Sequence, residues 1–382
     1  MSDRPTATPA MIAAGSGGIA QTTLLLREPG PGELTVRLDA AALCTTDLFS
    51  TDGLGLTPRP FVPGHAATGV VEEVGLGTGL RPGTRVVVVG SAQCGRCRAC
   101  LRGSPGACDD IWDGMGRAVG TLADDPTVTV HADGGVGTWA QTMLYRESNV
   151  VAIKSDAPPS HLAMLGCGIT SGLGAVLEVG RVRAGDTVAV LGCGHLGLWM
   201  IAGAVLAGAE RIIAVEPRAE RRTVAAELGA TDVVDRIEDV VARILDLTGG
   251  RGVDVALEAV GSTAAMEQAF AVTRRGGTVV PTGMVPPDEP VRLPGLEFAI
   301  GSRRIASSQT GGGDIHRTVP HYAALLDKGV LRPELFVTSV RPLAEVEAGL
   351  AGVRDRTGIT SVITMAEHAT PIHARPTEEV AP

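Results

Sequence analysis

The stretch from Thr187 to Glu216 constrains the fold of this chain more than any other part of its sequence. Residues 187–191 form a β-branched, apolar run of the length of a buried parallel strand. A G-x-G-x-x-G pattern follows at once at 192–197, and the apolar segment after it predicts a buried helix. A second strand is predicted over 211–215. Strand, glycine-rich turn, helix and strand in this order are typical of a dinucleotide-binding unit.

Each glycine of this turn has a separate structural role in binding a dinucleotide. Gly192 permits a tight turn, Gly194 lets the backbone approach a pyrophosphate, and Gly197 lets the helix pack against the strand. Glu216 follows at about the separation at which the motif carries an acid for the ribose hydroxyls, and its charge disfavours a 2′-phosphate. The turn therefore predicts NAD, with NADP as the less favoured alternative because Arg218 and further arginines follow.

The regular alternation of elements continues beyond Glu216. Strands are predicted over 253–257 and 277–280, with a helical stretch over 264–274 between them. Alternating strands and helices favour a doubly wound parallel sheet, so the predicted class is α/β. The chain has 382 residues, of which 44% are hydrophobic, enough for about two to three domains.

Charge and hydropathy exclude several partners. The formal net charge of −9 disfavours nucleic acid or an anionic membrane as the main partner. No apolar run reaches the length of a membrane span, and the first residues lack the pattern of a secretory signal, so we expect a cytoplasmic protein. Residues 1–18 and 367–382 are rich in small, polar or proline residues, and we expect both ends to be poorly ordered.

Four of the seven cysteines lie in one short segment. Cys94, Cys97, Cys100 and Cys108 have the spacing C-x2-C-x2-C-x7-C, which lets a loop wrap four thiolates around one tetrahedral zinc ion. Reduced surface thiols without a metal are the alternative, but such a group would be prone to oxidation. With four protein ligands this zinc would have no open position, so the sequence predicts a structural site in a lobe at residues 91–110.

A second candidate site is discontinuous in the sequence. Cys44 and His65 each follow a predicted strand, and Cys167 lies between two glycines. Two cysteines and one histidine are a donor set that leaves zinc one open position. Spacing alone does not assemble these three residues, and each one taken singly is better explained as a buried core side chain.

Taken together, these motifs resemble the zinc-dependent alcohol dehydrogenases of the medium-chain dehydrogenase/reductase superfamily. The resemblance covers roughly residues 25–365 and rests on Cys44-x-Thr46-Asp47, Gly64-His65, the four-cysteine lobe, Gly166-Cys167-Gly168, the turn at Gly192, Glu216 and Gly283. It implies that Cys44, His65 and Cys167 bind a catalytic zinc. With the structural site, this would make two zinc ions per chain. It also assigns cofactor contacts to Gly192, Gly194, His195, Leu196, Gly197, Glu216, Arg218, Val260, Gly283, Met284 and Val285.

The resemblance also implies an arrangement of domains and a reaction. A GroES-like, distorted β-barrel catalytic domain would take residues 1–168 and 306–382, and a Rossmann domain would take 169–305. Hydride would pass between an alcohol carbon and NAD(H), while Thr46 relays the hydroxyl proton. Asp47 would fix the tautomer of His65. An alcohol or aldehyde is the implied substrate, and a homodimer or homotetramer is the expected assembly.

Several positions depart from the family pattern. Ala66 stands where a glutamate usually follows the ligand histidine, and Thr45 stands where a cationic residue often faces the pyrophosphate. Gly90 replaces an aromatic pocket wall, while Trp139 matches another wall position. We expect Gly90 to enlarge the pocket and Trp139 to stack on the substrate, with core packing as its alternative role. The sequence therefore predicts a substrate bulkier than ethanol.

Two further functions stay open at this point. The chain would be a nicotinoprotein if it keeps NAD(H) bound and transfers hydride between substrates. It would be redox-silent, binding NAD and zinc only, if Ala66 and Thr45 mark a lost activity.

Overall fold

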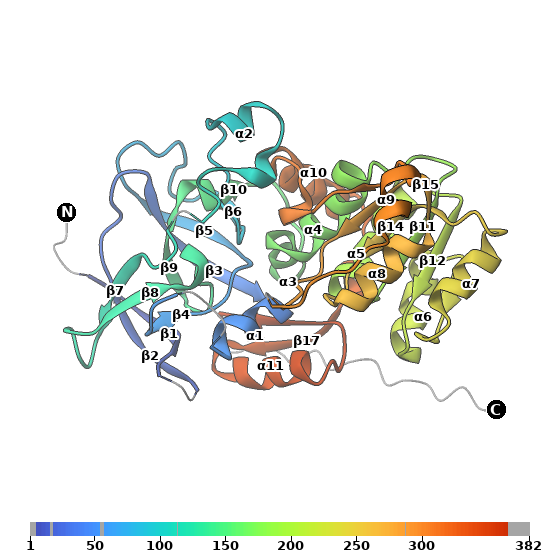
Figure 1. Cartoon of the computed structure of the whole chain (residues 1–382). Coiled ribbons are helices and arrows are strands. Elements are labelled where there is room, and N and C mark those ends of the chain that lie inside the picture. Colours follow the sequence, from blue (N-terminus) through green and yellow to red (C-terminus); the bar gives the residue numbers. More distant parts are fainter. Residues whose placement is uncertain (1–4, 16–17, 54–56, 113, 287, 366–382) are drawn as a thin grey trace. The chain divides into compact units, whose positions relative to one another are not determined.

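The computed structural model describes residues 5–15, 18–53, 57–112, 114–286 and 288–365, which fold into two compact units. The first unit comprises Met1–Cys94, Cys108–Cys167 and Ile315–Pro382, and the second comprises Gly95–Ala107 and Gly168–Asp314. The first unit therefore joins the blue N-terminal strands of Figure 1 to the red C-terminal segment. The domain limits inferred from the sequence stay a prediction.

The first unit contains a closed barrel and a mixed sheet. The barrel has the strand order β1 (Thr6–Ala13), β2 (Ile19–Leu26), β7 (Ala118–Leu122), β8 (Thr129–Ala132) and β4 (Phe61–Val62). The sheet has the order β10 (Val150–Ala152), β6 (Arg85–Val88), β5 (Ala67–Val74), β3 (Glu33–Ala42), β18 (Thr360–Thr364) and β17 (Val337–Pro342), and β9 (Thr142–Arg146) also pairs with β3. Strand β18 thus brings the end of the described chain beside β3.

The expectation of a poorly ordered N-terminus is wrong for the described residues. Thr6–Ala13 pairs along its whole length with Ile19–Leu26, and Ala10 and Met11 lie in the hydrophobic core. Burial of these apolar side chains offsets the entropy of ordering the segment, which its small-residue composition had suggested would stay unfolded. The C-terminal segment 367–382 lies outside the described residues.

Short helices surround this unit. They are α1 (Thr45–Thr51), α3 (Pro159–Leu162), η4 (Ala163–Gly166), α10 (Ile315–Asp327) and α11 (Val346–Arg354). Helix α1 begins directly after Cys44, and η4 ends directly before Cys167. Two of the candidate metal ligands therefore lie at helix boundaries, where the backbone geometry is fixed by the neighbouring turn.

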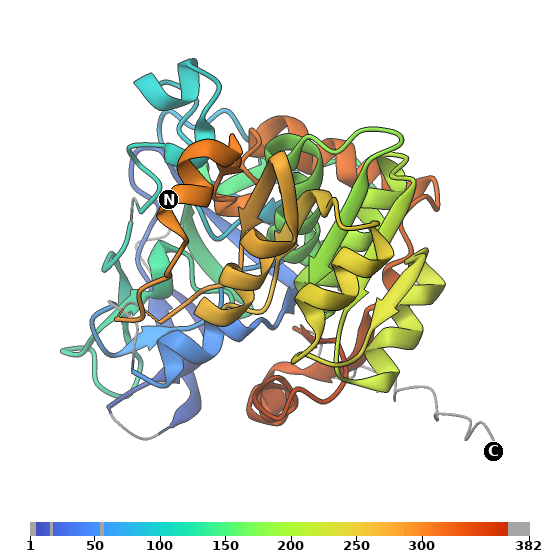
Figure 2. The same cartoon turned by 45° about the vertical axis from the view of Figure 1, so that its right-hand side comes forward.

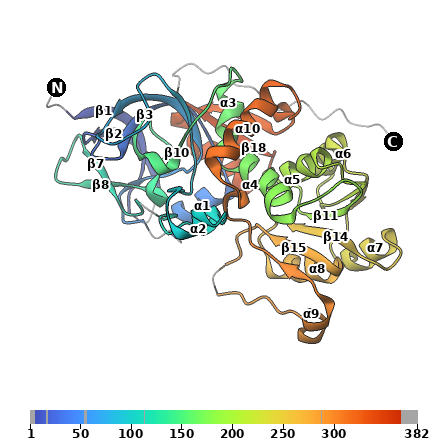
Figure 3. The same ribbon diagram turned by 90° about the horizontal axis from the view of Figure 1, so that it is seen from above.

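The second unit is a parallel sheet with helices on both faces, as Figures 2 and 3 show. Its strand order is β13 (Asp232–Val234), β12 (Arg211–Val215), β11 (Thr187–Leu191), β14 (Val253–Glu258), β15 (Thr273–Pro281) and β16 (Arg304–Ile305). Its helices include α4 (Gly168–Gly174), η5 (Ala175–Gly180), α5 (His195–Leu206), α6 (Ala219–Leu228), α7 (Val240–Leu247), α8 (Thr263–Val272) and α9 (Gly295–Gly301). The order reverses at β11, as a doubly wound sheet requires, so the predicted α/β class is confirmed.

The helices of this sheet differ in polarity because they differ in burial. Helix α5 is apolar almost all round, and Leu198 to Ile201 are completely buried. Helices α5 and α6 lie on one face, and α8 lies on the other (Figure 3). Among the described residues no single helix is long and apolar enough to cross a membrane. One bent pair, Pro159–Gly166 with Gly168–Gly180, passes that test by length and composition alone.

Candidate active site

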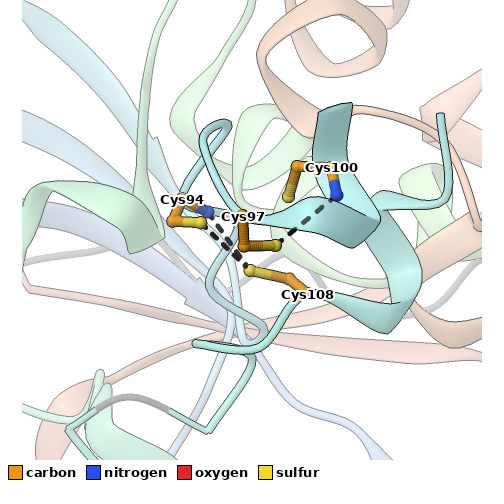
Figure 4. Close-up of side chains that lie close together, drawn as sticks. All are labelled: Cys94, Cys97, Cys100 and Cys108. Atoms are coloured by element: carbon orange, nitrogen blue, oxygen red, sulfur yellow. Dashed lines mark hydrogen bonds between the residues drawn. The ribbon is translucent and has the colours of Figure 1, made fainter. Parts of the chain in front are cut away.

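The four clustered cysteines converge on one point. The sulfur atoms of Cys94, Cys97, Cys100 and Cys108 all lie within 4.8 Å of one another, and Figure 4 shows the thiols turned toward a common centre. Backbone N–H groups also point at two of these sulfurs. Cys108 Sγ accepts from the backbone of Cys94 at 3.4 Å, and Cys97 Sγ accepts from the backbone of Cys100 at 3.5 Å. Such donors stabilise thiolates, so this segment is a candidate structural zinc site.

The discontinuous donors also meet, within the first unit. The ligand atoms of Cys44, His65 and Cys167 lie within 4.8 Å of one another. They come from three places in the chain: the N-cap of α1 shortly after β3, the loop after β4, and the residue between η4 and α4. Thr46 Oγ1 lies 3.7 Å from Cys44 Sγ, so a hydroxyl stands beside the cluster.

Asp47 ties two of these donors together. One carboxylate oxygen accepts from the Cys44 backbone N–H at 2.8 Å, and the other lies 2.7 Å from Nδ1 of His65. Burial raises the pKa of the Asp47 carboxyl, although the His65 ring opposes this effect. Burial also acts to lower the pKa of His65, but the Asp47 and Cys167 side chains raise it well above its ordinary value. Asp47 thereby holds the imidazole with Nδ1 turned away from the cluster.

The three donors fit a zinc ion. His65 Nε2 is buried and has no hydrogen-bond partner among the described residues. The hydrogen bond with the Cys44 thiol and burial raise the pKa of Cys167 well above its ordinary value. A buried polar atom without a partner beside two crowded thiols is unfavourable unless a cation neutralises the group. Two sulfurs and one nitrogen around such a cation leave a fourth tetrahedral position open.

The predicted cofactor residues lie in the second unit, after the carboxyl ends of adjacent parallel strands. The turn after β11 leads into α5 at His195, and Glu216 and Arg218 follow β12. Val260 follows β14 and is 49% exposed, while Gly283, Met284 and Val285 follow β15. This edge of a doubly wound sheet is where such folds bind their ligands.

The glycine-rich turn has the geometry that its pattern predicts. Gly192 has φ +90°, and a Cβ on Gly197 would lie 1.8 Å from the carbonyl oxygen of Gly192. Glu216 is 4% exposed, and its carboxylate accepts from the backbone N–H of Cys193 at 2.9 Å and of Arg218 at 3.1 Å. The acid therefore supports the turn itself, and its remaining lone pairs are available for a ligand.

The two predicted pocket residues differ in their placement. Gly90 borders the candidate ligand His65, because a Cβ at this position would lie 3.1 Å from Cδ2 of His65. Trp139 is fully buried in the hydrophobic core of the first unit, beside Gly64. This placement favours core packing for Trp139, the role that the sequence left as its alternative.

Comparisons with known proteins agree with this architecture. Residues 30–155 match the family described as alcohol dehydrogenase GroES-like domain, and residues 196–328 match the family described as zinc-binding dehydrogenase. The NDMA-dependent alcohol dehydrogenase of Amycolatopsis methanolica is 33% identical over 354 residues, which are 89% of this chain and 94% of that protein. The chain belongs to the zinc-binding alcohol dehydrogenase family. The predicted GroES-like and Rossmann domains and the predicted enzyme class are thus confirmed.

Solved structures of this alcohol dehydrogenase family are similar over nearly the whole chain. An alcohol dehydrogenase zinc-binding domain protein from Burkholderia ambifaria has a TM-score of 0.88 at 29% identity, covering 94% of this chain and 99% of that one. The benzyl alcohol dehydrogenase of Acinetobacter calcoaceticus has a TM-score of 0.86 at 27% identity, covering 94% and 100%.

One buried acid of this alcohol dehydrogenase was not found from the sequence. Glu258 is the last residue of β14 and is completely buried, and its side chain accepts from the backbone N–H groups of Val260 and Gly261. The available signal was an acidic residue at the end of an otherwise apolar strand, two residues before the predicted contact Val260. An acid in that place is also common as an ordinary strand end, so the pattern alone did not separate the two roles.

Proposed function

We propose that the chain is an NAD(H)-dependent zinc alcohol dehydrogenase that acts on alcohols or aldehydes bulkier than ethanol. The observation that carries the proposal is the group Cys44, His65 and Cys167, which offers three partly buried donors and has a hydroxyl beside it. When bound there, zinc would act as a Lewis acid on the substrate oxygen. Thr46 would take the hydroxyl proton, and Asp47 would keep His65 oriented toward the metal.

The preference for NAD is supported by Glu216. A carboxylate that is 4% exposed at the end of β12 can accept from ribose hydroxyls and would repel a 2′-phosphate. Arg222 is engaged with the carbonyl oxygens of Glu216 and Pro217, and Arg218 lies 3.7 Å from Glu220. A zinc-binding dehydrogenase of Sinorhizobium meliloti, 27% identical, is bound to NADP, so the ratio of kcat/KM for NAD and NADP is the direct measurement.

The bulkier substrate is supported by Gly90 and by one solved relative. Gly90 leaves open the space in which a side chain would stand against His65, and the benzyl alcohol dehydrogenase takes an aromatic alcohol by name. We expect kcat/KM for benzyl alcohol to exceed that for ethanol by about 10-fold or more, because each buried methylene contributes about 0.8 kcal/mol. A preference for ethanol would contradict this part of the proposal.

The central experiment combines zinc analysis with turnover. Protein purified without chelator should contain about two zinc ions per chain and should produce NADH from a panel of alcohols. Metal-free protein, or zinc-loaded protein that binds NADH without turnover of any alcohol, would contradict it, and the second result would favour the redox-silent alternative. The cytoplasmic location and the homodimeric or homotetrameric assembly stay predictions.

A second candidate is favoured by one comparison. The relative from Amycolatopsis methanolica is NDMA-dependent by name, and a requirement for such an added compound would be compatible with a nucleotide that stays bound in this chain. If this chain is a nicotinoprotein, the purified protein should release about one NAD(H) per chain on denaturation, as measured by absorbance. If the chain is a dehydrogenase that exchanges its cofactor with solution, the denatured protein should release no nucleotide.

A further inference from the structure

Glu258 connects two loops at the carboxyl edge of the parallel sheet. The residue ends β14, between β11 and β15, and its side chain is completely buried. Oε1 accepts from the backbone N–H of Val260 at 2.8 Å and of Gly261 at 2.7 Å. One carboxylate oxygen therefore fixes the direction in which the chain leaves β14.

The same residue holds the loop that follows β15. The carbonyl oxygen of Glu258 accepts from the backbone N–H groups of Thr282 at 3.0 Å and Gly283 at 3.2 Å. A Cβ on Gly283 would lie 3.0 Å from Oε2 of Glu258 and 2.2 Å from the amide nitrogen of Gly261. The two loops thus meet over this carboxyl group, at a distance that only glycine permits at position 283.

Burial of the Glu258 carboxyl group has a high desolvation cost. Oε2 has no hydrogen-bond partner in the part of the chain that the structure describes. Burial raises the pKa of the carboxyl group, against the lowering effect of the backbone N–H groups of Gly261, Val260, Gly283 and Ser262. An apolar side chain of the same size would pack here at a lower desolvation cost, so the hydrogen bonds of Oε1 need a reason beyond the stability of the sheet.

Glu216 is a second buried acid at the carboxyl edge of the sheet, and its position corresponds to that of Glu258. Glu216 directly follows β12, the strand on the other side of β11, and its buried carboxylate accepts from the backbone N–H of Cys193 in the glycine-rich turn. The central strand is therefore flanked by two buried acids, each of which fixes the backbone of a loop that contains predicted cofactor contacts. Fixed loops lose less entropy when a ligand binds.

We propose that Glu258 is a positioning residue for the dinucleotide: its Oε1 and carbonyl oxygen fix the loops at Val260 and Gly283 in the conformation that binds the cofactor. The inference rests on the proposed function, since it takes these loops as the cofactor contacts. Glu258 itself touches no ligand in this role. The arrangement requires a side chain long enough to bring an acceptor oxygen to the N–H groups of Val260 and Gly261, and it does not require a negative charge.

Two variants of Glu258 separate the effect of side-chain length from the effect of charge. Glu258→Gln keeps an oxygen at the same distance and removes the charge, whereas Glu258→Asp keeps the charge and withdraws the acceptor from Val260 and Gly261. We expect the Kd for NADH, measured by fluorescence titration, to rise about 10-fold in Glu258→Asp and to stay within about 2-fold in Glu258→Gln. Hydrogen exchange at the two amides should quicken in Glu258→Asp alone, while kcat at saturating cofactor should change by less than about 3-fold.

Asp254 supplies a matched control. It lies near the other end of β14, and its carboxylate accepts from the backbone N–H of Thr187 at 2.8 Å and from Arg274 Nε at 2.6 Å. Asp254→Glu changes the reach of an acid on the same strand and should leave the NADH Kd within about 2-fold of wild type.

The NADH Kd values and exchange rates of these variants either support or overturn the positioning role of Glu258. The reverse order of the two Glu258 variants, or wild-type affinity and exchange in both, would overturn the inference. An equal loss in Asp254→Glu would overturn it as well, because it would show that the effect is general to the strand. Failure of the wild-type chain itself to bind NADH would instead refute the proposed function.

Discussion

The two groups of candidate zinc ligands differ in how the chain builds them. The cysteine lobe takes four sulfurs from one continuous segment, Cys94 to Cys108, so the number of protein donors already completes a tetrahedral ion. The other group takes two sulfurs and a nitrogen from three separate elements and has Thr46 and Asp47 beside it. Residue spacing within one segment is therefore enough to build the closed site, whereas the open site forms only when the sheet, the barrel and η4 of the first unit have folded together.

Removing a donor from the open site should have the largest effect on catalysis. In Cys44→Ala, two donors are too few to hold zinc in the position where it supplies several kcal/mol of transition-state stabilisation. We expect kcat/KM to fall by at least about 1,000-fold and the zinc content to fall by about one ion per chain. Elemental analysis and steady-state kinetics measure both, and circular dichroism should show an unchanged fold. Retention of activity would show that this group is not the reactive site.

Removing a donor from the lobe should act on structure instead. In Cys97→Ala the fourth sulfur is lost, and so is the acceptor for the backbone N–H of Cys100 at the start of α2 (Arg98–Leu101). Because metal binding is coupled to local folding, we expect loss of about one zinc ion and faster proteolysis within residues 95–107. Activity per remaining zinc should fall less than about 10-fold. The comparison fails if this variant loses activity as completely as Cys44→Ala.

The same contrast explains which parts of the site are readable from sequence. The lobe and the turn at Gly192 are local, so spacing and periodicity were sufficient for both. Cys44, His65 and Cys167 are far apart in the chain, and only the family resemblance grouped them before the structure did. The hydrogen bond of Asp47 with the Cys44 backbone is a capping-box contact at the start of α1, and cysteine in place of the usual serine or threonine at the N-cap hides that pattern in the sequence.

Two other features show why composition is a weaker guide than pairing. The first strand, Thr6–Ala13, looked unstructured because its residues are small, yet it pairs with β2 and its apolar side chains lie in the hydrophobic core. Glu258 was missed because its importance lies in the backbone N–H groups it accepts from, and a sequence does not display those. Both cases depend on contacts that only the assembled sheet provides.

Weakening the support of the open site should have a smaller effect than removing a donor. Asp47→Asn replaces a carboxylate that accepts from both His65 and the Cys44 backbone, so the imidazole is held less firmly. We expect zinc affinity at this site to fall about 10- to 100-fold, as measured by competition with a chelator. Asp52→Asn is the control, because Asp52 lies just after α1 and pairs with Arg354 at the surface, 2.7 Å away. Equal affinities in all three proteins would contradict a supporting role for Asp47.

The smallest expected effect concerns stability at low pH. The question is whether the open site releases zinc at a higher pH than that at which the first unit unfolds. Glu33 begins β3, the strand that leads to Cys44, and its side chain is 8% exposed. Burial opposes its ionisation, but Arg27, the Gly30 N–H and Arg117 together lower the pKa of Glu33 to about 2. Because the folded-state pKa lies below the unfolded one, this group stabilises the fold above about pH 4.5, and the stabilisation is lost as the pH falls toward about 2.

We expect Glu33→Gln to lower the free energy of unfolding by about 2 kcal/mol at pH 7, a value reduced for solvent screening at the 39% exposed Arg27. The difference from wild type should shrink between about pH 4.5 and 2 and vanish below that range. Urea denaturation across this range, with zinc content followed in parallel, gives both curves. Metal release above pH 4.5 with the fold intact would show that the open site loses zinc independently of the stability of the first unit. A difference between the two proteins that does not change with pH would show that Glu33 contributes by packing alone.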